Sequence, residues 1–195
     1  MGNVFENSIL LIGPPSVGKS SLSRILSEKT SMPTVSLDDS RDKYYYELGY
    51  DRNYANKLKM EEGILARYKY WKQFEAHHVS KFLPNIPEES IIKFEASQTV
   101  YEDPELFMKV SNEIKKYNNV ILLLPDIDLH ESWRLVNKIG KVPVGSDLSK
   151  LNWHLISSPC NGELATFTTC IAGRTSEEVA DEIINFINSK KKAIN

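Results

Sequence analysis

The chain has 195 residues and a formal net charge of -2 at neutral pH. A chain of this length can bury a core on both faces of a sheet, so we expect one domain over residues 1–195. The charge balance lacks the excess of lysine and arginine typical of nucleic-acid-binding proteins, and the one basic run lies at residues 190–192. No stretch reaches the about 18 apolar residues of a membrane span. With only Cys160 and Cys170, the composition favours a cytoplasmic protein without nucleic-acid or membrane partners.

Apolar runs of strand length alternate with longer segments of helical period, which predicts an α/β fold with a parallel sheet covered by helices. Strands are predicted at residues 8–12, 34–37, 91–94, 120–124 and 165–172. Helices are predicted at residues 19–29, within a long insertion at 38–83, at 104–117, at 129–138, and from 176 onward. Glycines and prolines interrupt the period between 125 and 166, so we expect a mobile lid-like segment at 125–150 followed by an irregular connection.

One segment between the first predicted strand and helix matches the P-loop (Walker A) pattern G-x-x-x-x-G-K-[ST] without a mismatch. Its residues are Gly13, Pro14, Pro15, Ser16, Val17, Gly18, Lys19 and Ser20, followed by Ser21. A tight glycine turn points successive backbone N–H groups at phosphates. We expect Lys19 to reach the β- and γ-phosphates, Ser20 to ligate Mg²⁺, and the helix N-terminus to favour the anion. The alternative, a chance match in a glycine turn, lacks this strand-before and helix-after context.

Carboxylates follow two of the predicted strands. Asp38 and Asp39 come directly after the second strand, at the edge of the sheet where ligands of open α/β folds bind. They are expected to orient Mg²⁺ through water or to accept a proton from a substrate hydroxyl; the alternative is a helix N-cap with a solvated neighbour. Glu95 ends the third strand and would face the metal if that strand lies beside the first.

Three arginines are candidates for binding anions or the base of a nucleotide. Arg134 lies in the predicted lid helix, where closure would bring it to the phosphates. Arg67 in the insertion would bind an anionic group of a substrate, and Arg174 after the fifth strand would stack on adenine. For each, a solvated or structural role is the alternative. The tyrosines at residues 44–46 either wall a substrate pocket or pack the insertion onto the sheet.

Together these segments resemble the nucleoside monophosphate kinase group of P-loop kinases, and most of all shikimate kinase. The resemblance rests on I-L-L-I-G-P-P-S-V-G-K-S-S at residues 9–21, V-S-L-D-D-S at 35–40 and I-A-G-R-T-S-E-E-V-A-D-E-I-I at 171–184. It implies a three-layer fold with a five-stranded parallel sheet in the order 2-3-1-4-5. It also implies ATP as phosphoryl donor, Mg²⁺ as metal, a substrate-binding insertion at 38–83 and a lid after the fourth strand.

Carried over residue by residue, Lys19 and Ser20 keep the family roles, and Asp38 or Asp39 matches the aspartate that contacts the substrate hydroxyl. The arginine of the family's Gly-Phe-Arg element has its nearest counterpart in Arg67. The family's Gly-Gly-Gly turn after the third strand is replaced here by residues 95–97. The arginine-proline signature of the lid is missing, which leaves Arg134 as a loose equivalent.

The function expected from the sequence is transfer of the γ-phosphoryl group of ATP to a hydroxyl of a small metabolite by a monomer or weak dimer. Catalysis is assigned to Lys19, Asp38 or Asp39, and Arg134. A guanine-reading Asn-Lys-x-Asp element is absent, since the nearest string at residues 137–140 lacks its aspartate. The alternative is a regulatory or degenerate kinase-like protein that binds ATP without transfer.

Overall fold

The computed structural model describes residues 5–194; residues 1–4 and 195 of the expected domain lie outside this range. Its centre is a sheet of parallel strands in the order β2-β3-β1-β4-β5, which confirms the predicted order. The strands are β1 (Phe5–Ile12), β2 (Thr34–Ser36), β3 (Ile91–Lys93), β4 (Tyr117–Leu124) and β5 (Phe167–Cys170).

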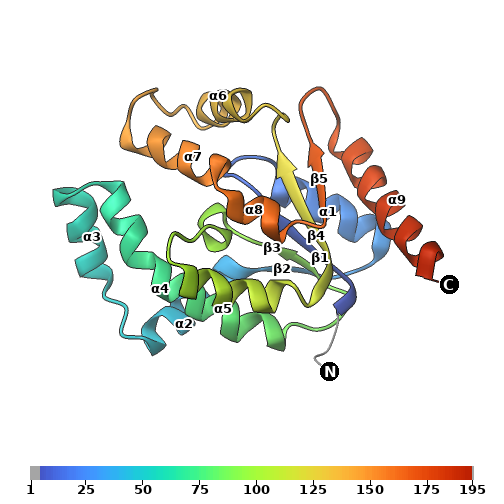
Figure 1. Cartoon of the computed structure of the whole chain (residues 1–195), viewed down its shortest axis with the longest axis horizontal. Coiled ribbons are helices and arrows are strands. Elements are labelled where there is room, and N and C mark those ends of the chain that lie inside the picture. The colour runs from blue at the N-terminus through green and yellow to red at the C-terminus, as the bar shows by residue number, and fades with distance from the viewer. Residues whose placement is uncertain (1–4, 195) are drawn as a thin grey trace.

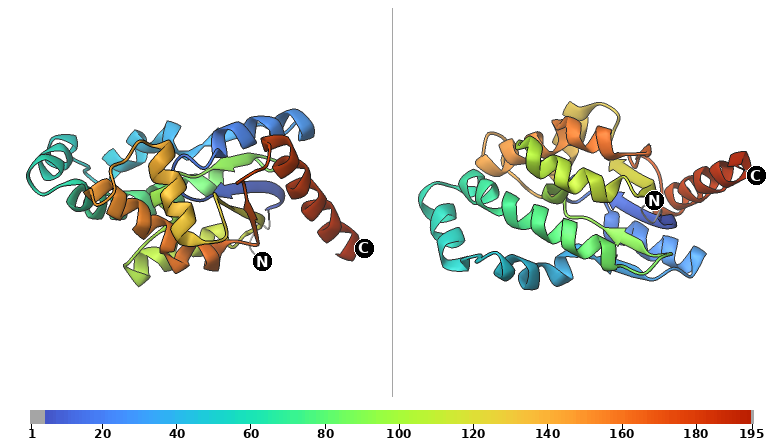
Figure 2. Two further views of the ribbon diagram at one scale, coloured as in Figure 1. Left: turned by 90° about the horizontal axis from the view of Figure 1, so that it is seen from above. Right: turned by 60° about the horizontal axis from the view of Figure 1, so that its bottom comes forward.

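Helices cover both faces of this sheet (Figures 1 and 2). The α-helices are α1 (Lys19–Thr30), α2 (Arg41–Glu47), α3 (Arg52–Glu61), α4 (Ile64–Phe82), α5 (Pro104–Ile114), α6 (Leu129–Ile139), α7 (Asp147–Ser157), α8 (Pro159–Leu164) and α9 (Ser176–Ile194). Short 3-10 turns are η1 (Leu37–Ser40), η2 (Leu83–Asn85) and η3 (Ala96–Thr99). The α1 and α9 helices pack on one face, while α4, α5 and α8 pack on the other.

The central strand β1 shows why the sheet is buried on both sides. Ile9 and Leu11 belong to the cluster shared with α1 and α9, whereas Leu10 and Ile12 belong to the cluster shared with α4 and α5. Successive side chains of a strand point to opposite faces, so a continuous apolar run fits a strand with helices on both sides. This arrangement places the P-loop directly at the carboxyl end of the central strand.

One predicted helix boundary was wrong. The helix expected over residues 104–117 ends at Ile114, and Tyr117 begins β4. Tyr117 is buried, and its hydroxyl donates a hydrogen bond to the carbonyl oxygen of Leu83 at 3.0 Å. An aromatic side chain anchored in this way suits a strand, although its spacing from Ile114 also fits a helix.

The irregular connection expected before β5 was also wrong, because α7 and α8 fill most of it, while the predicted helix at 129–138 is present as α6. The residues that interrupt the pattern lie at helix boundaries. Pro143 and Gly145 fall between α6 and α7, and Pro159 occupies the first turn of α8, where a missing N–H costs nothing. Ser146 and Ser158 cap the two helices through their side chains, a signal present in the sequence.

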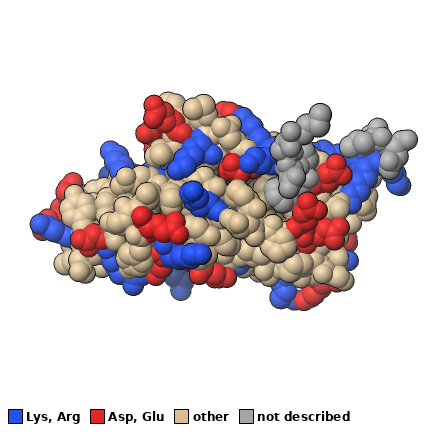
Figure 3. All heavy atoms as spheres, turned by 90° about the horizontal axis from the view of Figure 1, so that it is seen from below, with Lys and Arg blue, Asp and Glu red and all other residues tan. Residues whose placement is uncertain are grey.

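The surface carries charges of both signs. On the face drawn in Figure 3, lysine and arginine side chains alternate with aspartate and glutamate, without a field of one sign. Among residues 5–194, no helix combines the length and the apolar composition that crossing a bilayer requires.

The close approach of the P-loop to β4 gives a test of the fold. Gly13 has φ of +135°, and a Cβ there would lie 2.3 Å from the carbonyl oxygen of Leu123. Gly18 has φ of +89° but no atom within 4 Å of such a Cβ. We expect Gly13→Ala to lower the free energy of unfolding by about 3 kcal/mol and Gly18→Ala by about 1 kcal/mol. Urea unfolding measures both, and equal losses would contradict the close approach.

Candidate functional site

The P-loop has the backbone of an anion-binding turn. Gly13, Ser16 and Gly18 have positive φ angles, and α1 begins after Gly18 without a side-chain cap. The N–H groups at the start of α1 are therefore available to an anion, and the helix dipole favours a negative charge there. The Nζ of Lys19 donates to the carbonyl oxygens of Gly13 and Pro14, both at 2.8 Å, so its ammonium is held inside the loop.

Lys19 is a buried cation with little opposite charge around it. Its exposed fraction is 8%, and burial lowers its pKa from 10.5 to about 8. Lys93 lowers this pKa further by repulsion, whereas Glu95 opposes the shift. A phosphate bound in the loop would supply the missing negative charge.

Lys93 is a site residue that the sequence analysis missed. It ends β3, and its Nζ lies 3.3 Å from the Oγ of Ser20. The sequence contained a signal, because ligand-binding residues of open α/β sheets gather at the carboxyl ends of strands. The residues expected at these strand ends were carboxylates, but a phosphate site also needs cations. Two lysines thus lie at the start of α1.

Beside the P-loop lies a cleft of about 190 Å³, called here the acidic cleft. Its lining residues are Asp38, Arg41, Tyr45, Trp71, Glu75, Glu95, Ser97 and Gln98. The structure thus brings Asp38 and Glu95 together, and Glu95 is close enough to Lys19 to raise its pKa. Asp38 and Asp39 are both exposed, but only Asp38 lines the cleft, where it accepts a 2.8 Å hydrogen bond from Arg41.

Arg67 lies at the side of the acidic cleft. Its guanidinium stacks over the ring of Trp71 at 4.4 Å, and Trp71 lines the cleft. The Nε of Arg67 is buried and has no hydrogen-bond partner among residues 5–194. Burial and the nearby charge of Arg41 lower the pKa of Arg67. A buried donor without an acceptor is unfavourable unless a ligand supplies one.

The other two arginines differ in their positions. Arg174 lines a cavity of about 110 Å³ together with Gly18 and Ser21, and its Nη1 donates to Glu182 at 2.8 Å. Arg134 forms an ion pair with Glu131 on the exposed face of α6 and lines neither this cavity nor the acidic cleft. The structure therefore places Arg174, but not Arg134, beside the P-loop.

Two of the three tyrosines of α2 pack against α4, and the third, Tyr46, is exposed. Tyr45 is buried against Phe74 and also lines the acidic cleft. Tyr44 stacks on His78, whose Nε2 lies 2.9 Å from the Oγ of Ser40. Aromatic contacts thus join α2 to α4 and form one wall of the cleft.

The oxygen ligands around the P-loop fit a magnesium ion held mainly by phosphates. Within residues 5–194 no group of three histidine, cysteine or acidic side chains is placed to hold a metal alone. Mg²⁺ in phosphate-binding sites usually takes one or two protein oxygens together with phosphates and waters. Ser20 Oγ and the Glu95 carboxylate supply such oxygens, provided that the Lys93 ammonium turns away from Ser20.

Comparisons with known proteins identify the fold. No protein-family model matches the chain, and no curated protein sequence matches it. Among solved structures, shikimate kinase from Acinetobacter baumannii in complex with shikimate is 14% identical, with a TM-score of 0.60 over 95% of this chain and 94% of that chain. A gluconokinase from Sinorhizobium meliloti 1021 is 16% identical, with a TM-score of 0.60 over 98% and 97%.

A shikimate kinase from Aquifex aeolicus is 18% identical, with a TM-score of 0.58 over 94% of this chain and 98% of that chain. Identities this low establish the fold alone. The chain has the three-layer fold of P-loop kinases, as its sequence predicts.

The depressed pKa of Lys19 predicts how anion binding depends on pH. Without ligand, Lys19 loses its proton as pH rises through about 8. A bound polyphosphate favours the ammonium, so binding above that pH takes up a proton. We expect the affinity for inorganic triphosphate to fall by up to about tenfold per pH unit above pH 8, until the pKa of the complex is reached.

Calorimetry in buffers with different ionisation enthalpies measures this proton uptake directly. Proton uptake by other groups of the protein or by the ligand itself is measured with the control variant Lys19→Arg, whose side chain stays charged over this pH range. Affinity that falls equally in the wild type and in Lys19→Arg would contradict the assignment.

Proposed function

We propose that this protein is an ATP-dependent phosphotransferase that moves the γ-phosphoryl group to a hydroxyl of a small metabolite. The observation that carries the proposal is that Glu95 links two neighbouring sites. Glu95 lines the acidic cleft together with Asp38 and also acts electrostatically on Lys19 in the P-loop. A phosphoryl group in the loop and a hydroxyl in the cleft would therefore meet.

The residues of the P-loop would hold the donor. The N–H groups at the start of α1 bind the phosphates, and Lys19 leaves the carbonyls of its own loop to pair with them. Lys93 adds a second positive charge from β3. Mg²⁺, when bound, would neutralise phosphate charge, with Ser20 and Glu95 as its protein ligands. Arg174 would lie against the adenine, since its cavity adjoins Gly18 and Ser21.

Asp38 is the best-placed group to act on the acceptor. It lines the acidic cleft, and its pairing with Arg41 keeps the carboxylate oriented. It would orient the acceptor hydroxyl and accept its proton as phosphoryl transfer proceeds. Residues 38–83 would form the acceptor-binding insertion and residues 125–150 a lid. Arg134 would reach the phosphates only if α6 moves and the ion pair with Glu131 opens.

The charges at the cleft suggest the class of acceptor. Arg41 lines the acidic cleft, Arg67 stacks on Trp71 in its wall, and the Nε of Arg67 has no partner in the described structure. We infer an acceptor that carries a hydroxyl and an anionic group such as a carboxylate. The similarity to a shikimate kinase that binds shikimate and to a gluconokinase supports a hydroxylated carboxylate.

A second candidate is an ATP-binding regulatory protein without transfer activity. It is favoured by the contact of Lys93 with Ser20, because this contact occupies the hydroxyl that would ligate Mg²⁺. A transfer assay distinguishes the two candidates.

The test of the proposed function uses purified protein, ATP·Mg²⁺ and a panel of hydroxylated carboxylates. We expect ADP and a phosphorylated product, both absent in Lys19→Ala. In the matched pair, Asp38→Asn should lower kcat by about 10²- to 10⁴-fold and Asp39→Asn should change it less than about twofold. The product is measured by mass spectrometry and ADP by a coupled assay.

Binding of ATP without any phosphorylated product across the panel would favour the regulatory candidate. If Asp39→Asn lowered kcat and Asp38→Asn did not, the acceptor hydroxyl would lie near Asp39 rather than in the acidic cleft.

Arg67 provides a separate test of the acceptor class. Arg67→Met keeps an apolar stem against Trp71 and removes the charge, so KM for an anionic acceptor should rise about tenfold with KM for ATP unchanged. Arg24→Met is the matched control, because Arg24 forms a surface ion pair on α1. Initial-rate kinetics with both substrates varied measures these values; an equal rise in both KM values would contradict the assignment.

A further inference from the structure

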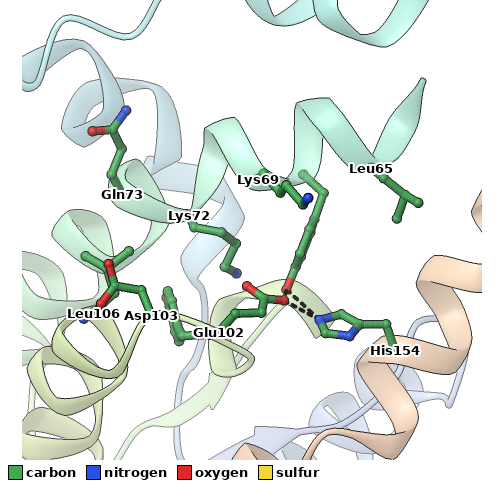
Figure 4. Close-up of a pocket in the computed structure, with 10 residues that line it drawn as sticks. Leu65, Lys69, Lys72, Gln73, Glu102, Asp103, Leu106 and His154 are labelled. Atoms are coloured by element: carbon green, nitrogen blue, oxygen red, sulfur yellow. Dashed lines mark hydrogen bonds and ion pairs between the residues drawn. The ribbon is translucent and has the colours of Figure 1, made fainter. Parts of the chain in front are cut away.

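Another cavity, of about 450 Å³ and larger than the acidic cleft and the Arg174 cavity, lies between α4, the start of α5 and α7 (Figure 4). We call it the α4–α5 cavity. It shares no lining residue with the acidic cleft or with the Arg174 cavity. Its volume falls within the roughly 300–1,000 Å³ typical of small-molecule sites. The proposed phosphotransferase function gives this cavity no role.

One part of the cavity wall is apolar. Leu65 and Tyr68 come from one face of α4, and Leu106 comes from α5 on the opposite side. Leu65 packs against a core cluster that contains Tyr68, and Leu106 packs against the main core, so both side chains are held in place. This wall suits a short apolar body rather than a sugar or a free phosphate.

Two carboxylates lie at the floor of the cavity, where the chain enters α5. Glu102 accepts a 2.9 Å hydrogen bond from the hydroxyl of Tyr68 and pairs with His154. Burial opposes ionisation of Glu102, but hydrogen bonds from its backbone, Tyr68 and His154 lower its pKa overall. Asp103 caps α5 through one oxygen, which accepts from the N–H of Glu105. The floor therefore carries the carboxylates of Glu102 and Asp103, of which Glu102 is paired with His154.

A positive charge comes from the α4 side. Lys69 lines the cavity, and the structure gives it no hydrogen bond or ion pair with any residue in 5–194. Lys72, one turn further along α4, is already committed to Glu75 and to the carbonyl of Ser97. Lys69 is thus the lysine of this wall that remains available to a ligand.

From this arrangement we propose that the α4–α5 cavity binds a small zwitterion with an apolar body, of which an apolar α-amino acid is the simplest. The ligand ammonium pairs with Glu102, the ligand carboxylate pairs with Lys69, and the apolar side chain lies against Leu65, while Asp103 and Leu106 line the opposite end of the cavity (Figure 4). A ligand with only a negative charge would meet the two carboxylates, and one with only a positive charge would meet Lys69.

The cavity also borders the acidic cleft through a buried ion pair. Lys72 lines the α4–α5 cavity, and its partner Glu75 lines the acidic cleft. The ammonium of Lys72 lies 4.8 Å from the ring centre of Tyr68 and 4.2 Å from that of Tyr101. A ligand against Tyr68 would therefore lie one side chain away from the pair that reaches the acidic cleft.

The first experiment measures binding to the wild-type protein by calorimetry, without ATP or acceptor. The probes are L-leucine, 4-methylpentanoate, which lacks the ammonium, and 3-methylbutylamine, which lacks the carboxylate. We expect saturable binding of leucine with a Kd of about 1 mM or tighter and about tenfold weaker binding of each analogue. Absence of leucine binding up to about 20 mM, or equal binding of an analogue, would overturn the proposal.

The second experiment locates the ligand. Lys69→Met and Glu102→Gln should each weaken leucine binding about tenfold. The matched controls are Lys59→Met and Glu88→Gln, which change exposed residues outside the cavity and should bind leucine like the wild type. Thermal unfolding checks that each variant is folded, and the analogue series on wild-type protein decides the question if Glu102→Gln is not.

Unchanged binding in both cavity variants would place leucine elsewhere and overturn the proposal. Because neither ATP nor acceptor is present, these results do not depend on phosphoryl transfer. The zwitterion site and the proposed function therefore stand or fall separately.

Discussion

The buried ammonium of Lys19 organises this end of the molecule. It lies inside a turn whose carbonyls of Gly13 and Pro14 accept its hydrogen bonds, and no carboxylate contacts it directly. Two carbonyl dipoles compensate a buried charge incompletely, which is why its pKa is lowered to about 8. The turn exists only because β1 delivers the chain to the carboxyl edge of the sheet and Gly13 packs against the backbone of β4. The sheet order and the placement of Gly13 thus together determine where the ammonium of Lys19 is buried.

This constraint explains the charges that surround the loop. Parallel strands end at the same edge, so β3 places Lys93 and then Glu95 beside the start of α1, and the chain after β2 places Asp38 across the cleft. Lys93 adds to the positive charge and Glu95 opposes it. Two lysines at the start of α1 suit the binding of an anion, whereas the carboxylates of Asp38 and Glu95 line the acidic cleft.

The sequence predicts what depends on local pattern and misses what depends on register. The P-loop follows from one short segment and the strand order from the family resemblance that such segments carry, and the structure contains both. Lys93 was missed because its contact with Ser20 joins residues 73 positions apart. Helices α7 and α8 replace the expected irregular connection, because Pro159 begins a helix rather than interrupting one. Whether Asp38 or Asp39 lines the acidic cleft depends on the geometry of the 3-10 turn η1, which the sequence does not reveal.

The buried ion pair of Lys72 and Glu75 positions the chain at Ser97 more than it stabilises the fold. Removing two charges from water is costly, and such pairs often contribute little net free energy to folding. Both members of the pair bind Ser97: Lys72 donates to its carbonyl oxygen, and Glu75 accepts from its hydroxyl. Ser97 lies two residues after Glu95, in the turn η3. The turn η3 is held from within by a capping box between Glu95 and Gln98 and from outside by the contacts of α4 with Ser97, so a helix that also walls the α4–α5 cavity helps to fix the turn that begins at Glu95.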